Sequence, residues 1–158
     1  VRFERATSTG RIAAYIHGIG NIGVLVELGT DSDTGAASPL IAGLGKDVAM
    51  QVAAASPIAV RRDEVPADVV EHELAIYKAQ AAETGKPEPI QEKIAQGRLE
   101  KYYKEFCLLE QPFVKNPDIT VAQHAEQAGR EAGATVEIVR FSRLVLGETN
   151  PDSKPASC

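Results

Sequence analysis

The chain lacks tryptophan, and aromatic side chains, cysteine and histidine are all scarce among its 158 residues. The two cysteines and three histidines stand singly, with no spacing that would let them share a metal ion, so no metal site is predicted. We expect Cys107, among apolar neighbours, to be a buried thiol, and Cys158 to be a residue of the tail. No apolar run approaches the roughly 20 residues that a membrane-spanning helix requires.

Positive charge is also in deficit, since 17 Lys and Arg stand against 22 Asp and Glu and the formal net charge is -5. No face can then be broadly basic, which disfavours a nucleic-acid binder held by phosphate contacts. A hydrophobic fraction of 44% and a charged fraction of 25% are typical of a globular protein. The length suffices for one domain with a sizeable core, or for a core plus an appendage.

The two ends of the chain carry little apolar pattern. The first ten residues, VRFERATSTG, contain neither the apolar core of a signal peptide nor a starting methionine. We therefore expect the chain to be a piece of a longer one. At the other end, residues 149–158 have no apolar periodicity, and we expect a disordered tail.

The first half of the sequence predicts a hairpin followed by a helix. Two short β-favouring runs, residues 11–17 and 22–28, are separated by Gly18-Ile19-Gly20-Asn21, which is typical of a tight turn. Residues 29–38 read as a polar, exposed loop. Residues 39–55 predict a helix with Ser38 as its N-cap and a proline at its first position. Its predicted apolar face holds Leu40, Leu44, Val48 and Val52.

The middle of the sequence predicts two long helices, residues 66–84 and 88–106, joined by a Gly-Lys-Pro turn that neither helix can cross. Their apolar residues repeat with the same spacing of four, three and four: Val70, Leu74, Tyr77 and Ala81 on the first, and Ala95, Leu99, Tyr102 and Phe106 on the second. Matched seams predict an antiparallel helical hairpin that packs like a short coiled coil. Gly97 lies inside the second helix and weakens it, so it marks a bend or a close approach.

The remaining segments complete an α+β pattern. Residues 108–114 predict a strand, residues 121–132 a helix capped by Thr120 and stopped by Gly133, and residues 135–146 a long strand. The predicted order is two strands, three or four helices, then strand, helix and strand. We therefore predict a small antiparallel sheet covered by helices on one face, with a protruding antiparallel helical hairpin.

Two motifs that suggest chemistry fail on their context. Gly18, Gly20 and Gly23 spell the GxGxxG dinucleotide fingerprint, but a strand follows where the fingerprint needs a helix N-terminus for the pyrophosphate. Asp31 and Asp33 would open a calcium loop only if a glutamate closed it at the twelfth position, where alanine stands. No nucleophile with a partnering base and no pair of carboxylates suggests catalysis, so we predict no catalytic residue, no cofactor and no enzyme.

Several segments resemble translation elongation factor Ts. They are YIHGIGNIGVLVEL (residues 15–28), GKDVAMQVAA (45–54), GKPEPIQEKIAQGRLEKYYKEFCLLEQPFVK (85–115) and VRFSRLVLGE (139–148). The resemblance covers residues 10–148 in order and without large gaps. It implies the C-terminal half of that factor's core, here residues 1–148, with the helical hairpin inserted at about 66–106.

The resemblance also implies a function. Elongation factor Ts binds the GTPase elongation factor Tu and promotes release of GDP, as a cytoplasmic or organellar (for example plastid) protein. Expected contacts with the partner are His17 and Gly18 after the first strand, Asp31 and Asp33 in the polar loop, and Leu109 and Phe113 after the long helices. No direct binding of nucleotide, nucleic acid or membrane is implied.

The chain departs from the family in two places. The family's Thr-Asp-Phe wedge is absent, because the residues after the second strand read Gly-Thr-Asp-Ser-Asp-Thr (29–34), with no phenylalanine. The amino-terminal helices and the closing helix are also missing. We therefore expect a docking piece that accelerates GDP release poorly, unless a wedge precedes it. A structural module of a larger translational protein, and a nucleotide-binding oxidoreductase that uses the GxGxxG motif, remain as alternatives.

Overall fold

The computed structural model describes residues 9–147, and the chain divides into two compact units. One unit is formed by residues 1–56 and 125–158, and the other by residues 57–124. The tail predicted for residues 149–158, with Cys158, lies outside the described residues.

The first unit contains a three-stranded sheet. Strands β1 (Gly10–His17), β2 (Ile22–Thr30) and β5 (Val136–Val145) pair in the order β1-β2-β5, and both pairings are antiparallel. The register sets His17 opposite Ile22, so the chain reverses within the four residues between them. This confirms the predicted hairpin and the α+β class with a small antiparallel sheet.

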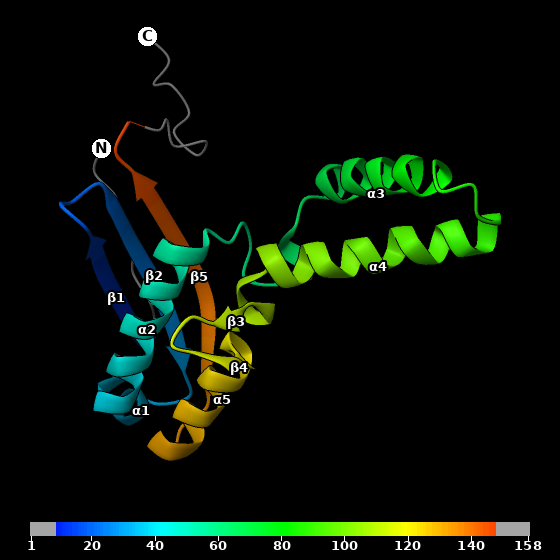
Figure 1. Ribbon diagram of the computed structural model, residues 1–158. Helices are drawn as coiled ribbons and strands as arrows, with labels where there is room; N and C mark the ends of the chain where they lie inside the picture. Colours follow the sequence, from blue (N-terminus) through cyan, green and yellow to red (C-terminus); the bar gives the residue numbers. More distant parts are fainter. Residues whose placement is uncertain (1–8, 148–158) are drawn as a thin grey trace, which may run out of the picture. The chain divides into compact units, whose positions relative to one another are not determined.

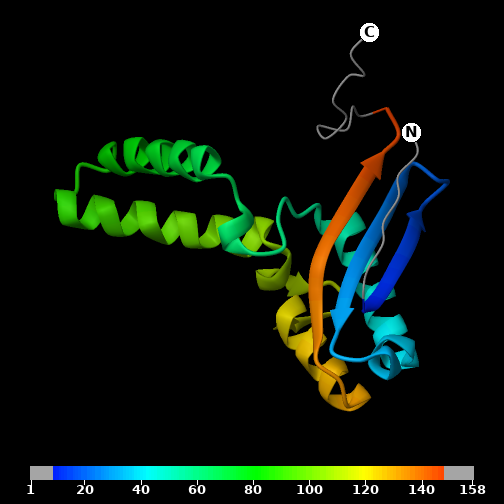
Figure 2. The same cartoon turned by 180° about the vertical axis from the view of Figure 1, so that it is seen from behind.

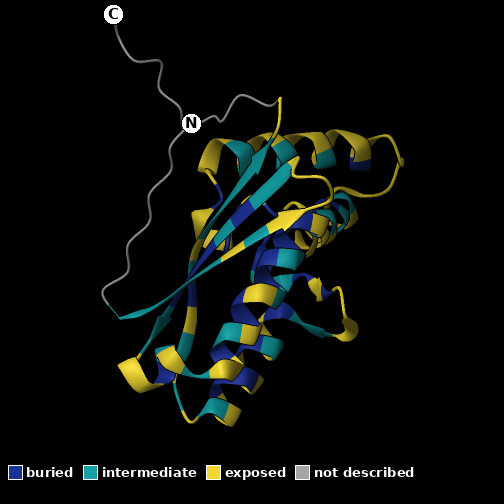
Figure 3. Ribbon diagram, turned by 90° about the vertical axis from the view of Figure 1, so that its left-hand side faces the viewer, coloured by how far each residue is buried: buried dark blue, intermediate teal, exposed yellow. Residues whose placement is uncertain are grey.

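Helices α1 (Asp33–Ala37) and α2 (Pro39–Ala55) lie over one face of this sheet (Figures 1 and 2). Ser38 caps α2 by accepting the backbone N–H of Leu40 at 3.3 Å, as predicted. Buried residues are concentrated between the sheet and its helices (Figure 3). The fully or almost fully buried apolar side chains include Val24, Val26, Leu28, Ile41, Leu44, Val48, Ala49, Val52 and Ile138.

Two local predictions for this unit are wrong. Leu40 is 45% exposed, and Ile41, one position later, is buried in its place, because Ile41 lies on the face of α2 that packs against the sheet. The loop of residues 29–38 is shorter than predicted, since β2 runs to Thr30 and α1 begins at Asp33. Ser32 caps α1 by accepting the N–H of Gly35 at 3.1 Å, a local bond that the loop interpretation overlooked.

The second unit contains the predicted helical hairpin. Helix α3 (Ala67–Ala82) and helix α4 (Glu88–Phe106) run antiparallel and pack against each other (Figure 1). Ala81, Ala95, Leu99 and Tyr102 of the predicted seam are buried, while Val70, Leu74, Tyr77 and Phe106 are partly buried against the same cluster. Cys107 closes the cluster as a fully buried thiol, as predicted, and burial raises its pKa to about 11.

The segment after α4 differs from prediction. Residues 108–114 were expected to form one strand, but Leu108–Glu110 form a 3-10 turn (η2) and only Pro112–Phe113 form a strand (β3). β3 pairs with β4 (Asn116–Thr120), a polar strand without the alternation that would reveal it in sequence. Thr120 caps α5 (Val121–Ala132) by accepting the N–H of Gln123 at 3.2 Å, as predicted. The 3-10 turn η1 (Arg62–Glu64) precedes α3.

Two glycines of α2 provide a matched test of how closely this helix approaches the sheet. A Cβ at Gly45 would lie 2.7 Å from Ala13 Cβ of β1, whereas a Cβ at exposed Gly43 would meet nothing within 4 Å. We predict that Gly45→Ala lowers the free energy of unfolding by about 1–3 kcal/mol through overpacking. Gly43→Ala should raise it by about 0.5–1 kcal/mol through helix propensity. Urea unfolding of both variants measures this, and equal effects would contradict the close approach.

Candidate partner-binding surface

The turn between β1 and β2 presents an isoleucine to solvent. Gly18 and Gly20 have φ angles of 63° and 99°, a backbone conformation that side chains disfavour, and the N–H of Gly20 donates to His17 O at 3.3 Å. Ile19, between them, is 100% exposed. The two glycines therefore create a tight turn that projects a large apolar side chain with no contact inside the described part of the chain.

Two further apolar side chains lie at the same end of the sheet. Ile16 of β1 is 71% exposed, and Leu146, just after β5, is 82% exposed. The N–H of Leu146 donates to Asn21 O at 2.8 Å, so the residue after β5 is tied to the turn between β1 and β2. We call Ile16, Ile19 and Leu146 the tip patch. Grouped, exposed apolar side chains of this size are typical of a protein interaction site.

His17 and Gly18 are expected site residues that the structure brings together with the tip patch. The His17 side chain is exposed, and its Nδ1 lies 3.1 Å from the hydroxyl of Tyr15, with ring centroids 5.9 Å apart. Tyr15 and His17 are two apart on β1, so both side chains lie on one face of the strand. The tyrosine thus orients an imidazole beside an apolar tip.

Asp31 and Asp33 lie at the opposite end of β2 from the tip, roughly 27 Å away by the rise of a strand. Asp31 Oδ2 accepts the N–H of Thr135 at 3.1 Å, and its own N–H donates to Thr135 O at 3.3 Å. The bond from the Thr135 backbone lowers the pKa of Asp31. Asp31 therefore joins the end of β2 to the start of β5, and Asp33 opens α1. Their predicted contact with a partner stays a prediction.

Leu109 and Phe113 belong to the second unit. Leu109 is half-buried in η2, and its N–H donates to Val60 O at 3.2 Å. Phe113 is only 5% exposed, and its ring stacks on that of His124 with centroids 4.2 Å apart and an interplanar angle of 13°. Val114, the next residue, is 46% exposed. The predicted binding role of both residues stays a prediction.

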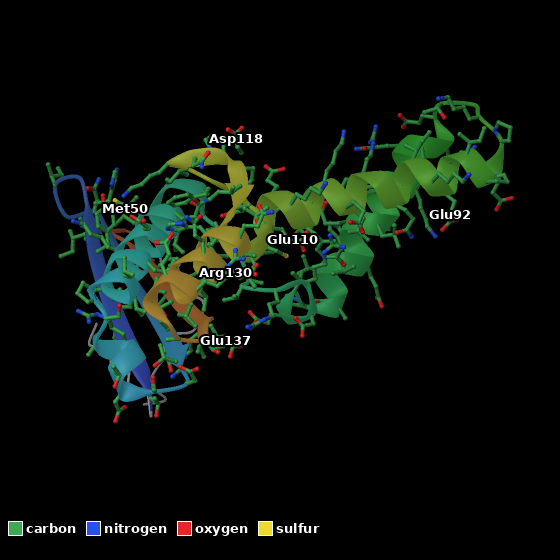
Figure 4. The ribbon with its side chains drawn as sticks, turned by 90° about the horizontal axis from the view of Figure 1, so that it is seen from below. Met50, Glu92, Glu110, Asp118, Arg130 and Glu137 are labelled. Carbon is green, nitrogen blue, oxygen red and sulfur yellow. The ribbon has the colours of Figure 1, made fainter. Side chains whose placement is uncertain are left out.

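An ion cluster in the second unit was not predicted. Arg62 of η1 donates from Nη1 and Nη2 to both carboxylate oxygens of Glu100, at 2.9 and 2.8 Å, and binds Glu110 through Nε and Nη2. Its guanidinium carbon lies 4.6 Å from the centre of the Tyr103 ring. Arg62 thereby ties η1 to α4 and to η2, whose Glu110 is labelled in Figure 4 and follows the C-terminal end of α4 in the chain. Arg62, Glu100 and Glu110 are too far apart in the sequence for their spacing to predict the cluster.

Other site classes find no support in the part of the chain that the structure describes. Within residues 9–147, no three His, Cys, Asp or Glu side chains gather as a metal site would require, and no helix is long and apolar enough to cross a membrane. Gly23 of the GxGxxG motif lies in β2, so the motif opens a strand and no helix N-terminus faces a phosphate.

Comparison with known sequences identifies the family. The sequence model of the family described as Elongation factor TS matches residues 1–148. The chain belongs to the elongation factor Ts family. It is 51% identical over 145 residues to Elongation factor Ts of Heliobacterium modesticaldum, covering 92% of this chain and 67% of that protein. The corresponding figures are 52%, 92% and 66% for Anaeromyxobacter sp. (strain Fw109-5), and 49%, 91% and 67% for Geobacter sulfurreducens.

Membership of the elongation factor Ts family assigns the chain to translation elongation. The chain spans about two thirds of the length of these relatives. Both the tip patch and the Arg62 cluster lie within the matched residues. Ile19, Leu146 and Arg62 are the residues that reasoning from sequence missed, and of these only Ile19, set between two turn glycines, carried a local signal.

The Arg62 cluster should make the stability of the folded chain depend on pH in the acidic range. Its guanidinium lowers the pKa of Glu100 below the usual value of 4.5, chiefly by hydrogen bonding. A carboxylate with a lowered pKa in the folded state contributes stability above its unfolded pKa, and that contribution is lost as the pH falls through the folded value. We predict that Arg62→Gln unfolds at lower urea than the parent at pH 7 and that the difference shrinks between pH 5 and pH 3.

A second arginine serves as the control for this prediction. Arg130 lies 3.8 Å from Glu126 in a largely exposed pair, which should contribute little at any pH. Arg130→Gln should therefore leave the urea midpoint almost unchanged at pH 7. A difference between parent and Arg62→Gln that stays constant from pH 7 to pH 3 would show that the cluster does not act through an ionised Glu100.

Proposed function

We propose that this chain binds the GTPase elongation factor Tu through the tip patch and His17, as the docking part of a nucleotide-exchange factor. The observation that carries the proposal is an exposed apolar tip, with an oriented imidazole beside it, in a chain of the elongation factor Ts family. Large apolar side chains held in solvent by a rigid turn favour a preformed protein contact, because little conformational entropy is lost on binding. Since the relatives compared are bacterial, the proposed compartment is the cytoplasm.

Exchange of this kind needs no covalent step. A factor that binds the nucleotide-free GTPase more tightly than the GDP-bound form weakens GDP binding by the same factor, through thermodynamic linkage. The protein therefore requires a complementary surface and no nucleophile or general base.

The segment after β2 favours docking over full exchange activity. By resemblance, the family presses a Thr-Asp-Phe wedge between helices of the GTPase, and this chain has no phenylalanine in residues 29–34. Here those residues end β2 and begin α1. Asp31 accepts a hydrogen bond from the backbone N–H of Thr135, and Ser32 caps α1 by accepting the N–H of Gly35. Their side chains are engaged in the fold itself. The non-catalytic alternative, a docking module of a larger translational protein, follows from the same segment.

Substitution at the tip tests the binding surface. We predict that Ile19→Ser weakens binding to nucleotide-free elongation factor Tu by about 2 kcal/mol, or roughly thirty-fold, because burial of an isoleucine side chain is lost. His17→Ala should weaken it by a smaller factor. Leu40→Ser is the control, since Leu40 is exposed on α2 of the same unit and away from the tip. Isothermal titration calorimetry measures all three, and an affinity unchanged by Ile19→Ser would remove the tip patch from the interface.

Release of nucleotide separates docking from exchange. We expect the chain to bind elongation factor Tu and yet accelerate release of a fluorescent GDP analogue only weakly in stopped-flow mixing. The physical reason is that no apolar wedge is available in residues 29–34 to separate the helices that hold the nucleotide. Release of the GDP analogue as fast as with an intact family member would contradict this expectation. The exchange step would then belong to residues of this chain.

A further inference from the structure

The outer face of α4 carries a row of lysines with a glycine at its centre. Lys93, Gly97, Lys101 and Lys104 fall within an arc of about 80° when each residue turns the helix by about 100°. All four are exposed, and they lie on the side of α4 opposite the buried seam of Ala95, Leu99 and Tyr102. We call these four residues the lysine rail. It spans about 16 Å along the helix.

Two of the three carboxylates near the rail have partners, while Glu105, four residues after Lys101, is exposed and has no ion-pair partner within residues 9–147. Glu92, in the N-terminal half of α4 (Figure 4), lies 3.2 Å from Lys78 of α3. Glu100 binds Arg62. Within residues 9–147, Lys93 and Lys101 form no ion pair, and Lys104 acts on Glu100 only as a nearby charge. Three lysines against Glu105 leave this face with a local excess of positive charge on a chain whose net charge is -5.

No steric constraint within the described part of the chain requires a glycine at position 97. A Cβ built there would meet nothing within 4 Å, and α4 continues through it from Glu88 to Phe106. A glycine inside an exposed helix is unfavourable relative to alanine, so its presence calls for a reason outside the helix. Flanked by Lys93 and Lys101, one turn away on either side, Gly97 forms a notch in the rail.

We propose that the lysine rail is a second docking surface, which takes an acidic helix of the partner GTPase where that helix crosses α4 at Gly97. This inference rests on the proposed function. The distance between packed helices depends on the side chains at the crossing point, and a glycine allows the shortest approach. The lysines on both sides of the notch can then reach carboxylates of the crossing helix, which selects an acidic partner and accelerates association.

A protein helix fits this surface better than a nucleic acid does. A phosphate backbone is attracted by any dense positive face and gains nothing from a notch, and the rail offers no aromatic side chain on which a base could stack. Ile90 is 44% exposed in the first turn of α4, and its apolar surface suits a protein neighbour. The chain as a whole repels polyanions.

Two substitutions at the notch, with a matched control, test the proposal. Binding kinetics with nucleotide-free elongation factor Tu are measured for Gly97→Ala, Gly97→Leu and Ala79→Leu. Ala79 is exposed on α3 and opposite its seam, so leucine there adds the same bulk outside the rail. We expect Gly97→Leu to weaken binding by about ten-fold or more, Gly97→Ala by about two- to three-fold, and Ala79→Leu by less than about two-fold. Thermal unfolding should show both Gly97 variants at least as stable as the parent.

A third variant tests the charges. Lys93→Gln, Lys101→Gln and Lys104→Gln together should lower the association rate and flatten its dependence on salt, with thermal stability unchanged. The same variants are also titrated with a 20-nucleotide single-stranded RNA as the competing class of ligand. We expect no RNA binding at physiological salt.

The outcomes separate the possibilities. If the parent binds elongation factor Tu and all variants bind equally well, the rail is not a docking surface, although the proposed function stands. If Gly97→Ala and Gly97→Leu weaken binding equally, the glycine acts through the flexibility of the helical hairpin. That result would refute Gly97 as a docking notch. RNA binding that the lysine variant abolishes, with unchanged affinity for elongation factor Tu, would also overturn the proposal. If the parent does not bind elongation factor Tu, the proposed function fails first.

Discussion

The register of β1 against β2 is the constraint on which the candidate surface depends. His17 pairs with Ile22 only because the chain reverses in four residues, and a slip of one residue would exchange the faces on which Ile16 and His17 lie. α2 holds that register from one side, since Ala13 of β1 sits where a side chain at Gly45 would have to be. A close helix–strand contact in the interior thus determines which side chains the tip offers to a partner.

Periodic patterns in the sequence were sufficient for most of the fold. The hairpin, α2 with its Ser38 cap, both long helices and the Thr120 cap could be predicted because each depends on residues within one or two turns of one another. Prediction failed where tertiary contacts decide. Leu40 and Ile41 are both apolar, and only packing on the sheet selects Ile41. The segment after α4 looks extended, yet β4 limits its pairing to two residues.

The candidate site was less predictable than the fold. His17 and Gly18 could be expected from the family resemblance, but the apolar patch beside them needs Leu146, which reaches the turn only through its bond to Asn21. Arg62 was missed because its carboxylates come from α4 and η2, 38 and 48 residues away. Mixed charges on the long helices looked like an ordinary solvated surface. In the structure Glu92 pairs with Lys78 and Glu100 with Arg62, whereas the outer face of α4 carries three lysines and Glu105.

The proposed recognition depends on exposed side chains that the turn between β1 and β2 holds in place. The proposal depends above all on contact between the tip of the β1–β2 hairpin and elongation factor Tu. Isoleucine-methyl NMR during titration with nucleotide-free elongation factor Tu tests this most directly. The account predicts that the signals of Ile16 and Ile19 shift or broaden while those of buried Ile41 and Ile138 stay in place. Unchanged Ile16 and Ile19 signals at saturation would contradict it.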